Sequence, residues 1–414
     1  MQRTAPTIVR ALRTHWVRWA AGPGLAGALL AAPPAHAQMR KAADISATPF
    51  PKPTGRFAVG THDYFWIDER RPEAYTKDPN DKRHLMVQIW YPAEAAPDAK
   101  PAPYVRNPDE FANPAEFKPV LHVMTNSVTD APVAKGEKRY PVLVYNHGGS
   151  WNRFSATFTT EQLASHGYVV VSVEHPGFAK VGVFPDGYRF APDTLQFPNP
   201  TGNMRDDVQG SWGYLNDPVF GIWVKDAQFA LDKVEELNRA VDSPLRGRLD
   251  LEHVGALGWS FGGATAVQLT RTDPRVQAAV DQDGQLFGDV RDLGTSRPVM
   301  LLHNTSDPLA GQKPENQAAM KEAVEQVRAW DRVLKEKSTN DWYTIEIAKT
   351  THGNFSDLTL FYPAGPDQID PRRAHEIINA YTLAFFDRYL RGTSSDLLKE
   401  PSAAFPEVTF TRKQ

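Results

Sequence analysis

A serine stands in the pentapeptide Gly258-Trp259-Ser260-Phe261-Gly262, after a short apolar run and before a stretch with helical spacing. Small residues on both sides let a strand and a helix approach closely, and a sharp turn between them exposes the hydroxyl at the carboxyl edge of a sheet. This context predicts that Ser260 is a nucleophile. The alternative is a structural serine in a turn.

A serine hydroxyl needs a base to remove its proton, so a histidine should follow in the chain. His352, in the sequence TTHGNFSD, comes after the last predicted strand, which is where the third member falls in the order serine, acid, histidine. We expect His352 to be the base. Four other histidines lie at or near strand ends and loops, and we expect them to be hydrogen-bonded structural residues: His147, His166, His175 and His303.

The acid that orients this histidine has three candidates. Asp281 and Asp283, in VDQDG, are two residues apart, so on an extended strand both point to the same face. They lie about 6.6 Å apart along such a strand, and Asp283 is nearer the carboxyl edge. Asp307 is the third candidate, because the acid can also come after the next predicted strand, 298–307. The letters DQDG also begin like a calcium loop, but the remaining ligands and the terminal glutamate are missing, so we expect no metal.

The negative charge that develops on a carbonyl oxygen needs preorganised donors, usually two backbone N–H groups. The amide of Phe261, directly after the serine, is one candidate. The second should come from YNHGGSW, at the end of the first core strand, because Gly148 and Gly149 let the backbone turn an amide inward.

Elements that could position these residues alternate from about residue 140. Near-continuous apolar runs imply strands buried on both faces, and the helices between them imply a parallel sheet. The runs are 141–146, 168–175, 253–260, 276–283, 298–307 and 342–352, and the helices are roughly 157–166, 222–239, 262–272, 313–336 and 373–391. Two further strands upstream, 57–69 and 84–93, should pair antiparallel at the sheet edge. The pattern predicts a doubly wound α/β domain.

Two segments show no regular pattern, 93–138 and 176–221. The second separates a strand from its helix by far more than a normal connection, so we expect an insertion that covers the active-site end. Its aromatic side chains either line an acyl pocket as a cap, with contact to lipid, or pack among themselves. Trp151 and Trp259 beside the elbow would narrow the acyl site and favour short acyl chains.

Composition places the chain among soluble globular proteins. Of 414 residues, 41% are hydrophobic and 23% are charged, and no run is long enough to span a membrane. We expect one domain over 38–414. The absence of cysteine excludes disulfides, thiolate metal sites and cysteine nucleophiles.

The first 37 residues combine arginines without acids, an apolar stretch and the small-residue site AHA. This pattern predicts a signal peptide cleaved after Ala37 and a secreted or periplasmic protein. Removing it takes Lys+Arg from 46 to 42 and leaves Asp+Glu at 49, so the mature net charge is about −7. Nucleic acid is therefore not an expected partner.

Several motifs together resemble the plasma and intracellular type II platelet-activating factor acetylhydrolases, which are α/β-hydrolases. They are VYNHGGSWNRFS, LASHGYVVVSVEHP, VGALGWSFGGAT, DPRVQAAVDQDG and THGNFSD, over about 141–357. The resemblance implies Ser260 as nucleophile, His352 as base and an oxyanion hole from the amides of Phe261 and Gly149. An ungapped comparison from SFGGAT places the family's acid on Asp283. Trp259 departs from the family, which usually has histidine there.

The resemblance implies calcium-independent hydrolysis of esters with short acyl groups, no cofactor, and an ester or phospholipid-like small molecule as substrate. A broad carboxylesterase or a polyester or cutin hydrolase is the alternative within this chemistry. Outside it, the alternative is a non-catalytic binding protein on a hydrolase fold. The sequence leaves the oligomeric state open.

Overall fold

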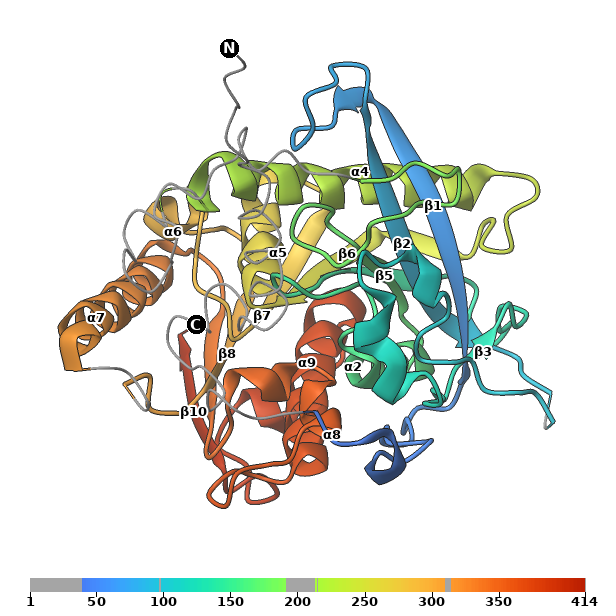
Figure 1. The fold of residues 1–414 in the computed structure, drawn as a ribbon. Coiled ribbons are helices and arrows are strands. Elements are labelled where there is room, and N and C mark those ends of the chain that lie inside the picture. The colour runs from blue at the N-terminus through green and yellow to red at the C-terminus, as the bar shows by residue number, and fades with distance from the viewer. Residues whose placement is uncertain (1–38, 97, 191–212, 214, 310–313, 414) are drawn as a thin grey trace, which may run out of the picture.

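The computed structural model describes residues 39–96, 98–190, 213, 215–309 and 314–413. The predicted signal peptide and the middle of the predicted 176–221 insertion therefore lie outside the described residues. Within the described part, one sheet runs through the molecule with helices on two sides (Figure 1).

The described residues form a ten-stranded sheet in the order β10-β9-β8-β7-β6-β4-β5-β2-β1-β3. Strands β4 to β9 pair in parallel, whereas β2 joins β5 and β1, and β10 joins β9, in antiparallel pairs. The strands are β1 (Ala58–Pro72), β2 (Lys82–Ala93), β3 (Val128–Thr129), β4 (Tyr140–Asn146), β5 (Val169–Val173), β6 (Leu249–Trp259), β7 (Val276–Gln282), β8 (Val299–Asn304), β9 (Trp342–Ile347) and β10 (Val408–Lys413).

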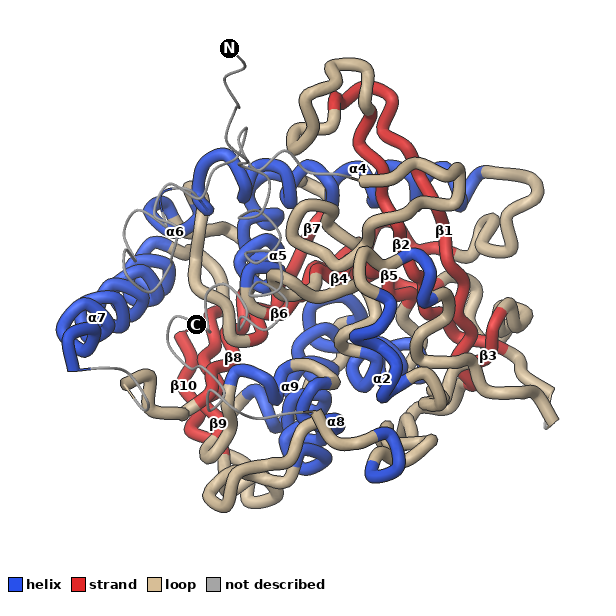
Figure 2. The backbone as a smooth tube through the Cα atoms, viewed as in Figure 1, coloured by secondary structure: helices blue, strands red, loops and turns tan. Residues whose placement is uncertain are grey.

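Helices cover both faces of this sheet, as the tube in Figure 2 shows. On one side are α4 (Phe220–Arg239), α5 (Phe261–Thr272), α6 (Val290–Leu293) and α7 (Pro314–Lys337), and on the other are α2 (Thr157–Ser165), α8 (Leu358–Phe361) and α9 (Pro371–Arg391). Short 3-10 or π turns are η2 (Ala42–Asp44), η3 (Pro108–Glu110), η4 (Pro114–Val120), η5 (Leu215–Val219), η6 (His352–Phe355) and η7 (Asp396–Leu398).

Burial on both faces explains why the central strands are so apolar. Every residue of β4 and β5 is buried, and valine, whose branched side chain suits a pleated surface, dominates them. Two large hydrophobic clusters fill the space between sheet and helices, one on each face. Helix α5 begins directly after β6, and its first ten residues are all buried. The centre of the sheet is therefore the most rigid platform for side chains at its carboxyl edge.

The predicted α/β class and mostly parallel sheet are confirmed. Several details differ from the prediction. Neither β3 nor β10 was predicted, because β3 has only two residues and β10 is a largely exposed edge strand that pairs only with β9. Strands β5, β8 and β9 also end earlier than predicted, at Val173, Asn304 and Ile347. In addition, β7 ends at Gln282, one residue before the predicted end, and Asp283 has a positive φ of 61°.

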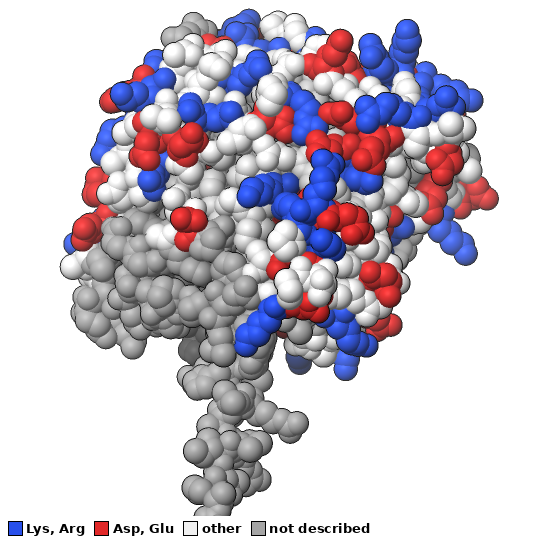
Figure 3. All heavy atoms as spheres, turned by 90° about the horizontal axis from the view of Figure 1, so that it is seen from above, with Lys and Arg blue, Asp and Glu red and all other residues white. Residues whose placement is uncertain are grey.

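On the face drawn in Figure 3, basic and acidic side chains of the described residues lie interspersed. Among the helices of the described residues, none has the length and apolarity needed to cross a bilayer.

A buried ion-pair cluster joins the β1–β2 hairpin to α4. Arg83 on β2 contacts Asp226 on α4 (Nη2 to Oδ2, 2.7 Å) and Glu73 (Nη1 to Oε2, 3.0 Å), and all three side chains are buried. Arg71 adds a second contact to Asp226 (Nη2 to Oδ1, 2.9 Å). Burial opposes ionisation, but these arginines and the hydrogen bond from His175 hold the pKa of Asp226 far below its usual value. Asp226 is therefore ionised in the folded protein.

We expect Asp226→Asn to lower the free energy of unfolding by about 3–5 kcal/mol, because it leaves the buried Arg83 and the partly buried Arg71 without their shared carboxylate. The matched control is Asp232→Asn, on the same helix, where a half-exposed carboxylate pairs with Arg275 at 2.8 Å. Exposed pairs contribute about 0–1 kcal/mol. Urea unfolding curves measure both changes, and equal losses in the two variants would contradict a stabilising role for the buried cluster.

Candidate active site

Ser260 occupies a tight turn between β6 and α5. Its backbone has φ 59° and ψ −125°, a conformation that non-glycine residues rarely adopt. Its N–H donates to the carbonyl of Gln282 on β7 (2.9 Å), and its own carbonyl accepts from the N–H of Gly263 (2.9 Å). These bonds fix the turn on both sides. The serine is thus held at the carboxyl edge of the central strands.

The glycines that flank this serine are dictated by close contacts. A Cβ atom on Gly258 would lie 2.3 Å from the carbonyl oxygen of Gly262. A Cβ atom on Gly262 would lie 2.1 Å from the carbonyl oxygen of Asn146 on β4. Neither distance is sterically possible, so the turn can form only with glycine at both positions. This is the physical content of the G-x-S-x-G pattern in this chain.

His352 and Asp283 form a hydrogen bond, with Nδ1 2.6 Å from Oδ2, and both side chains are buried. Because a carboxylate only accepts, Nδ1 carries the proton of this bond, and Nε2 is the ring nitrogen that can take up a proton. Among the described residues, neither Nε2 of His352 nor Oγ of Ser260 has a hydrogen-bond partner. Both atoms are therefore buried and not engaged in another hydrogen bond within this part of the chain.

Asn304, the last residue of β8, fixes the carboxylate of Asp283. Its backbone N–H donates to Oδ1 (2.8 Å) and its Nδ2 donates to Oδ2 (2.7 Å). Burial alone would raise the pKa of Asp283, but the hydrogen bond and charge of His352 and the N–H of Asn304 lower it below its usual value. Asp283 is therefore a fixed anion against the imidazole, as an acid that orients the base must be.

The other two candidate acids lie elsewhere. Asp281 accepts from the N–H of Gly284 (2.7 Å), its second oxygen has no partner among the described residues, and burial raises its pKa well above the usual value. Asp307 is exposed and accepts from the N–H of Leu309 (2.9 Å). The expectation that Asp281 and Asp283 share a strand face is wrong, because the chain turns at Asp283 after β7 has ended.

Trp259 has a role that the sequence did not predict. Its side chain is 1% exposed, and its Nε1–H donates to the backbone carbonyl of His352 (3.0 Å). The centroids of the two rings lie 5.0 Å apart. Thr351 and Asn354 add a capping box that fixes the turn carrying His352. The indole therefore positions His352. The one signal in the sequence is that Trp259 stands where the resemblance leads us to expect a different residue.

The two predicted oxyanion donors come from adjacent segments. Phe261 is the first residue of α5, so its N–H has no acceptor within the helix. Gly149 follows β4, and its neighbour Gly148 lies so close to Trp259 that a Cβ there would be 2.7 Å from the indole ring. Within the described residues, neither the Gly149 nor the Phe261 N–H is paired with an acceptor. Both groups are free to bind an oxygen.

The aromatic side chains near this serine come partly from the 176–221 segment. The ring of Phe261 packs against those of Trp223 (4.9 Å between centroids), Phe220 (5.4 Å) and Phe178 (6.4 Å). Farther along, Phe184 packs on the β1–β2 hairpin. Three of the predicted cap aromatics, Phe197, Trp212 and Tyr214, lie outside the described residues. Among the residues that are described, no group of three or more His, Asp or Glu could hold a metal.

We expect Asp283→Asn to lower kcat by about 10⁴-fold, because an amide at this position favours the wrong imidazole tautomer. Asp307→Asn, at an exposed site, should leave kcat within about threefold of the wild type. Steady-state hydrolysis of a nitrophenyl ester measures both rates. A large loss at Asp307 with little loss at Asp283 would show that Asp307 is the acid and that the assignment to Asp283 is wrong.

Asp281 should show a different dependence, on pH. In the folded protein the pKa of Asp281 is well above its usual value, because the carboxyl group is buried. In the unfolded chain the same group loses its proton at about pH 3.9, so ionisation of Asp281 favours unfolding. Asp281 should therefore contribute less to the free energy of unfolding as pH rises from about 4, and Asp281→Asn should remove this contribution to the slope while retaining activity. Urea unfolding at a series of pH values measures it. An unchanged slope in the variant would mean that Asp281 is ionised in the fold.

Several known proteins have sequences similar to this chain. The family model described as platelet-activating factor acetylhydrolase, isoform II, matches residues 42–178 and 232–398. A probable 1-alkyl-2-acetylglycerophosphocholine esterase from Arthroderma benhamiae is 26% identical over 289 residues, which are 65% of this chain and 66% of that protein. A platelet-activating factor acetylhydrolase from Canis lupus familiaris is 26% identical over 393 residues, which are 84% of this chain and 79% of that protein.

A solved structure is similar as well. The ferulic acid esterase from Streptomyces cinnamoneus aligns with a TM-score of 0.64 and 30% identity, covering 87% of this chain and 98% of that one. The unmatched stretch between the two parts of the family model, 179–231, overlaps the segment 176–221 that shows no regular sequence pattern. The resemblance inferred from the motifs is thus confirmed, and the chain belongs to the platelet-activating factor acetylhydrolase, isoform II, family.

Proposed function

We propose that this protein is an exported serine esterase that hydrolyses carboxylic esters with short acyl groups. The observation that supports this best is the pair of Asp283 and His352, at 2.6 Å, beside an elbow serine. The unpartnered atoms, Oγ of Ser260 and Nε2 of His352, are those that a nucleophile and its base require. Carboxylic ester hydrolysis is also the activity named for the relatives.

In the proposed reaction, Oγ of Ser260 attacks the ester carbonyl while Nε2 of His352 takes its proton. Asp283 stabilises the resulting imidazolium and holds its orientation. The N–H groups of Phe261 and Gly149 bind the oxyanion of the tetrahedral intermediate. The imidazolium then protonates the leaving alcohol, and an acyl-enzyme forms on Ser260. Water, deprotonated by His352, attacks this ester, and the acid product leaves.

The short-acyl part of the proposal comes from the names of the relatives, because the rings around Phe261 are core side chains. Trp223, Phe220 and Phe178 pack on the ring of that residue, and Trp223 and Phe220 are buried with it. The names of the relatives include an acetylglycerophosphocholine esterase, so a phospholipid-like ester with peripheral contact to lipid is our first candidate.

A broad carboxylesterase, or a polyester or cutin hydrolase, is the second candidate. The ferulic acid esterase supports it, because it is 30% identical and covers most of this chain. Both candidates use the same serine, histidine and acid, and they differ in the alcohol and acyl groups that fit. A small-molecule ester is the common substrate class.

Export to the periplasm or beyond is part of the proposal. It depends on residues 1–37, which have the basic, apolar and small-residue parts of a signal peptide and would be cleaved after Ala37. The lack of cysteine is compatible with an oxidising compartment, since a single large core needs no disulfide.

An ester panel tests the proposed function. We expect kcat/KM for nitrophenyl and glycerophospholipid esters to be highest with acetyl or other short acyl groups, as the name of the acetylglycerophosphocholine esterase indicates, and to fall with long chains. Ser260→Ala should reduce kcat by about 10⁶-fold on every substrate. Preference for long chains would contradict the short-acyl site. No hydrolysis above background by the wild type on any ester would instead support a non-catalytic binding protein.

A further inference from the structure

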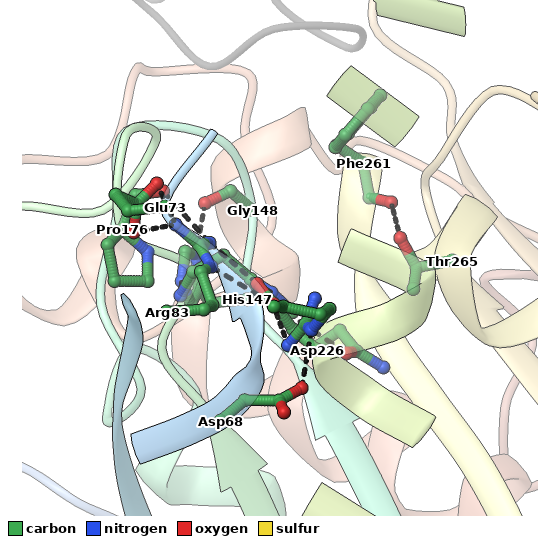
Figure 4. A network of polar contacts seen from close by, with 12 residues as sticks. Asp68, Glu73, Arg83, His147, Gly148, Pro176, Asp226, Phe261 and Thr265 are labelled. Atoms are coloured by element: carbon green, nitrogen blue, oxygen red, sulfur yellow. Dashed lines mark hydrogen bonds and ion pairs between the residues drawn. The ribbon is translucent and has the colours of Figure 1, made fainter. Parts of the chain in front are cut away.

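His147, directly after β4, makes two hydrogen bonds beside the proposed oxyanion hole. Its side chain is fully buried, with Nδ1 2.7 Å from the carbonyl oxygen of Gly148 and Nε2 3.0 Å from the backbone nitrogen of His175. Figure 4 shows the His147 side chain next to Gly148, within a larger polar network. The proposed mechanism gives this histidine no chemical step. Its contacts nevertheless involve the loop that supplies one oxyanion donor.

The partners of His147 leave only one tautomer. The backbone N–H of His175 can only donate, so Nε2 of His147 must accept. Burial and the neighbouring His175 lower the pKa of His147 well below its usual value, so the ring is neutral. A neutral imidazole has one N–H, which must then be on Nδ1 and must donate to the carbonyl of Gly148. The bond to that carbonyl is therefore a fixed feature of the fold.

Planarity of the peptide bond passes this constraint on to Gly149. The carbonyl of Gly148 and the N–H of Gly149 belong to one peptide unit, and in a trans peptide they point in opposite directions. The carbonyl is held by Nδ1 of His147 and by the N–H of Trp151 (3.2 Å). Two adjacent glycines would otherwise let this unit rotate freely. Holding the carbonyl thus sets the direction of the Gly149 N–H.

We propose that His147 is a positioning residue, which holds the Gly148–Gly149 peptide in the orientation that presents the Gly149 N–H to the oxyanion. This proposal rests on the serine esterase function proposed above. It assigns to His147 an effect on the transition state and none on substrate binding, because the oxyanion exists only after attack.

A buried network holds His147 in turn. The His175 ring contacts Asp226 (Nδ1 to Oδ2, 3.1 Å), which the arginines of the β1–β2 hairpin hold as an anion. Trp223 stacks on His175 with ring centroids 4.0 Å apart, and the same indole lies 5.0 Å from His147 and 4.9 Å from Phe261. One cluster therefore touches both segments that carry the proposed oxyanion donors, at His147 and at Phe261.

Two substitutions separate the two contacts of His147. In His147→Asn, the side-chain nitrogen lies near the position of Nδ1 and can still donate to Gly148, but nothing accepts from His175. In His147→Gln, the longer amide reaches the position of Nε2 and can accept from His175, but the bond to Gly148 is lost. Each variant loses one buried hydrogen bond, so their melting temperatures should fall by similar amounts.

We expect His147→Gln to lower kcat by about 10- to 100-fold with KM within about threefold, approaching the roughly 10²–10³-fold cost of losing one oxyanion donor. His147→Asn is the conservative variant and should recover at least about tenfold of that loss. A trifluoromethyl ketone, which forms a tetrahedral oxyanion on the serine, should bind His147→Gln more weakly by the same factor as kcat/KM falls. If His147→Gln does not fold, His147→Leu, which lacks both bonds, takes its place.

Equal kcat in the Asn and Gln variants, or a loss that appears in KM alone, would overturn the proposal, because a merely structural histidine affects both variants through stability. Ser260→Ala separates this failure from failure of the proposed function. If His147→Gln is as active as the wild type while Ser260→Ala is inactive, only the role of His147 is rejected. Full activity of Ser260→Ala would reject the catalytic serine and with it the proposal.

Discussion

The strained backbone of Ser260 is the constraint on which the rest of the site depends. A residue with φ 59° persists only where its surroundings determine it, and here the bonds to β7 and α5 and the glycines packed against β4 do so. The same turn brings Trp259 under the loop of His352 and places the Phe261 N–H at the start of α5. One backbone conformation thus orients the nucleophile and a proposed oxyanion donor, and it carries the indole that fixes the base.

Most of the fold and the candidate site could be predicted, because the relevant signals are local. Glycines at fixed offsets from Ser260, and histidine after the last parallel strand, follow from backbone geometry and chain order. Reach along the strand and the family comparison both favour Asp283 as the acid, but the expectation that Asp281 and Asp283 lie on one face of a strand was wrong. The turn at Asp283 depends on Asn304 and His352, 21 and 69 residues away, which no local pattern reveals.

The unpredicted features are contacts between distant segments. Pairing on one side only gives β10 a weak sequence pattern, and its register is set by β9. The N–H of Trp259 meets a carbonyl 93 residues away. Likewise, His147 was expected to be an ordinary structural histidine, and only the positions of His175 and Gly148 suggest that it orients a peptide. The sequence therefore predicts the candidate catalytic residues better than it predicts the contacts that position them.

The central claim is that Ser260 is a nucleophile activated by its position in the turn. Reaction with a fluorophosphonate, followed by intact mass measurement and peptide mapping, tests it most directly. The account predicts one phosphonyl group per chain, on the peptide that contains Ser260, and no label in Ser260→Ala. Absence of label on the wild type, or label on another residue at the same rate, would contradict the account.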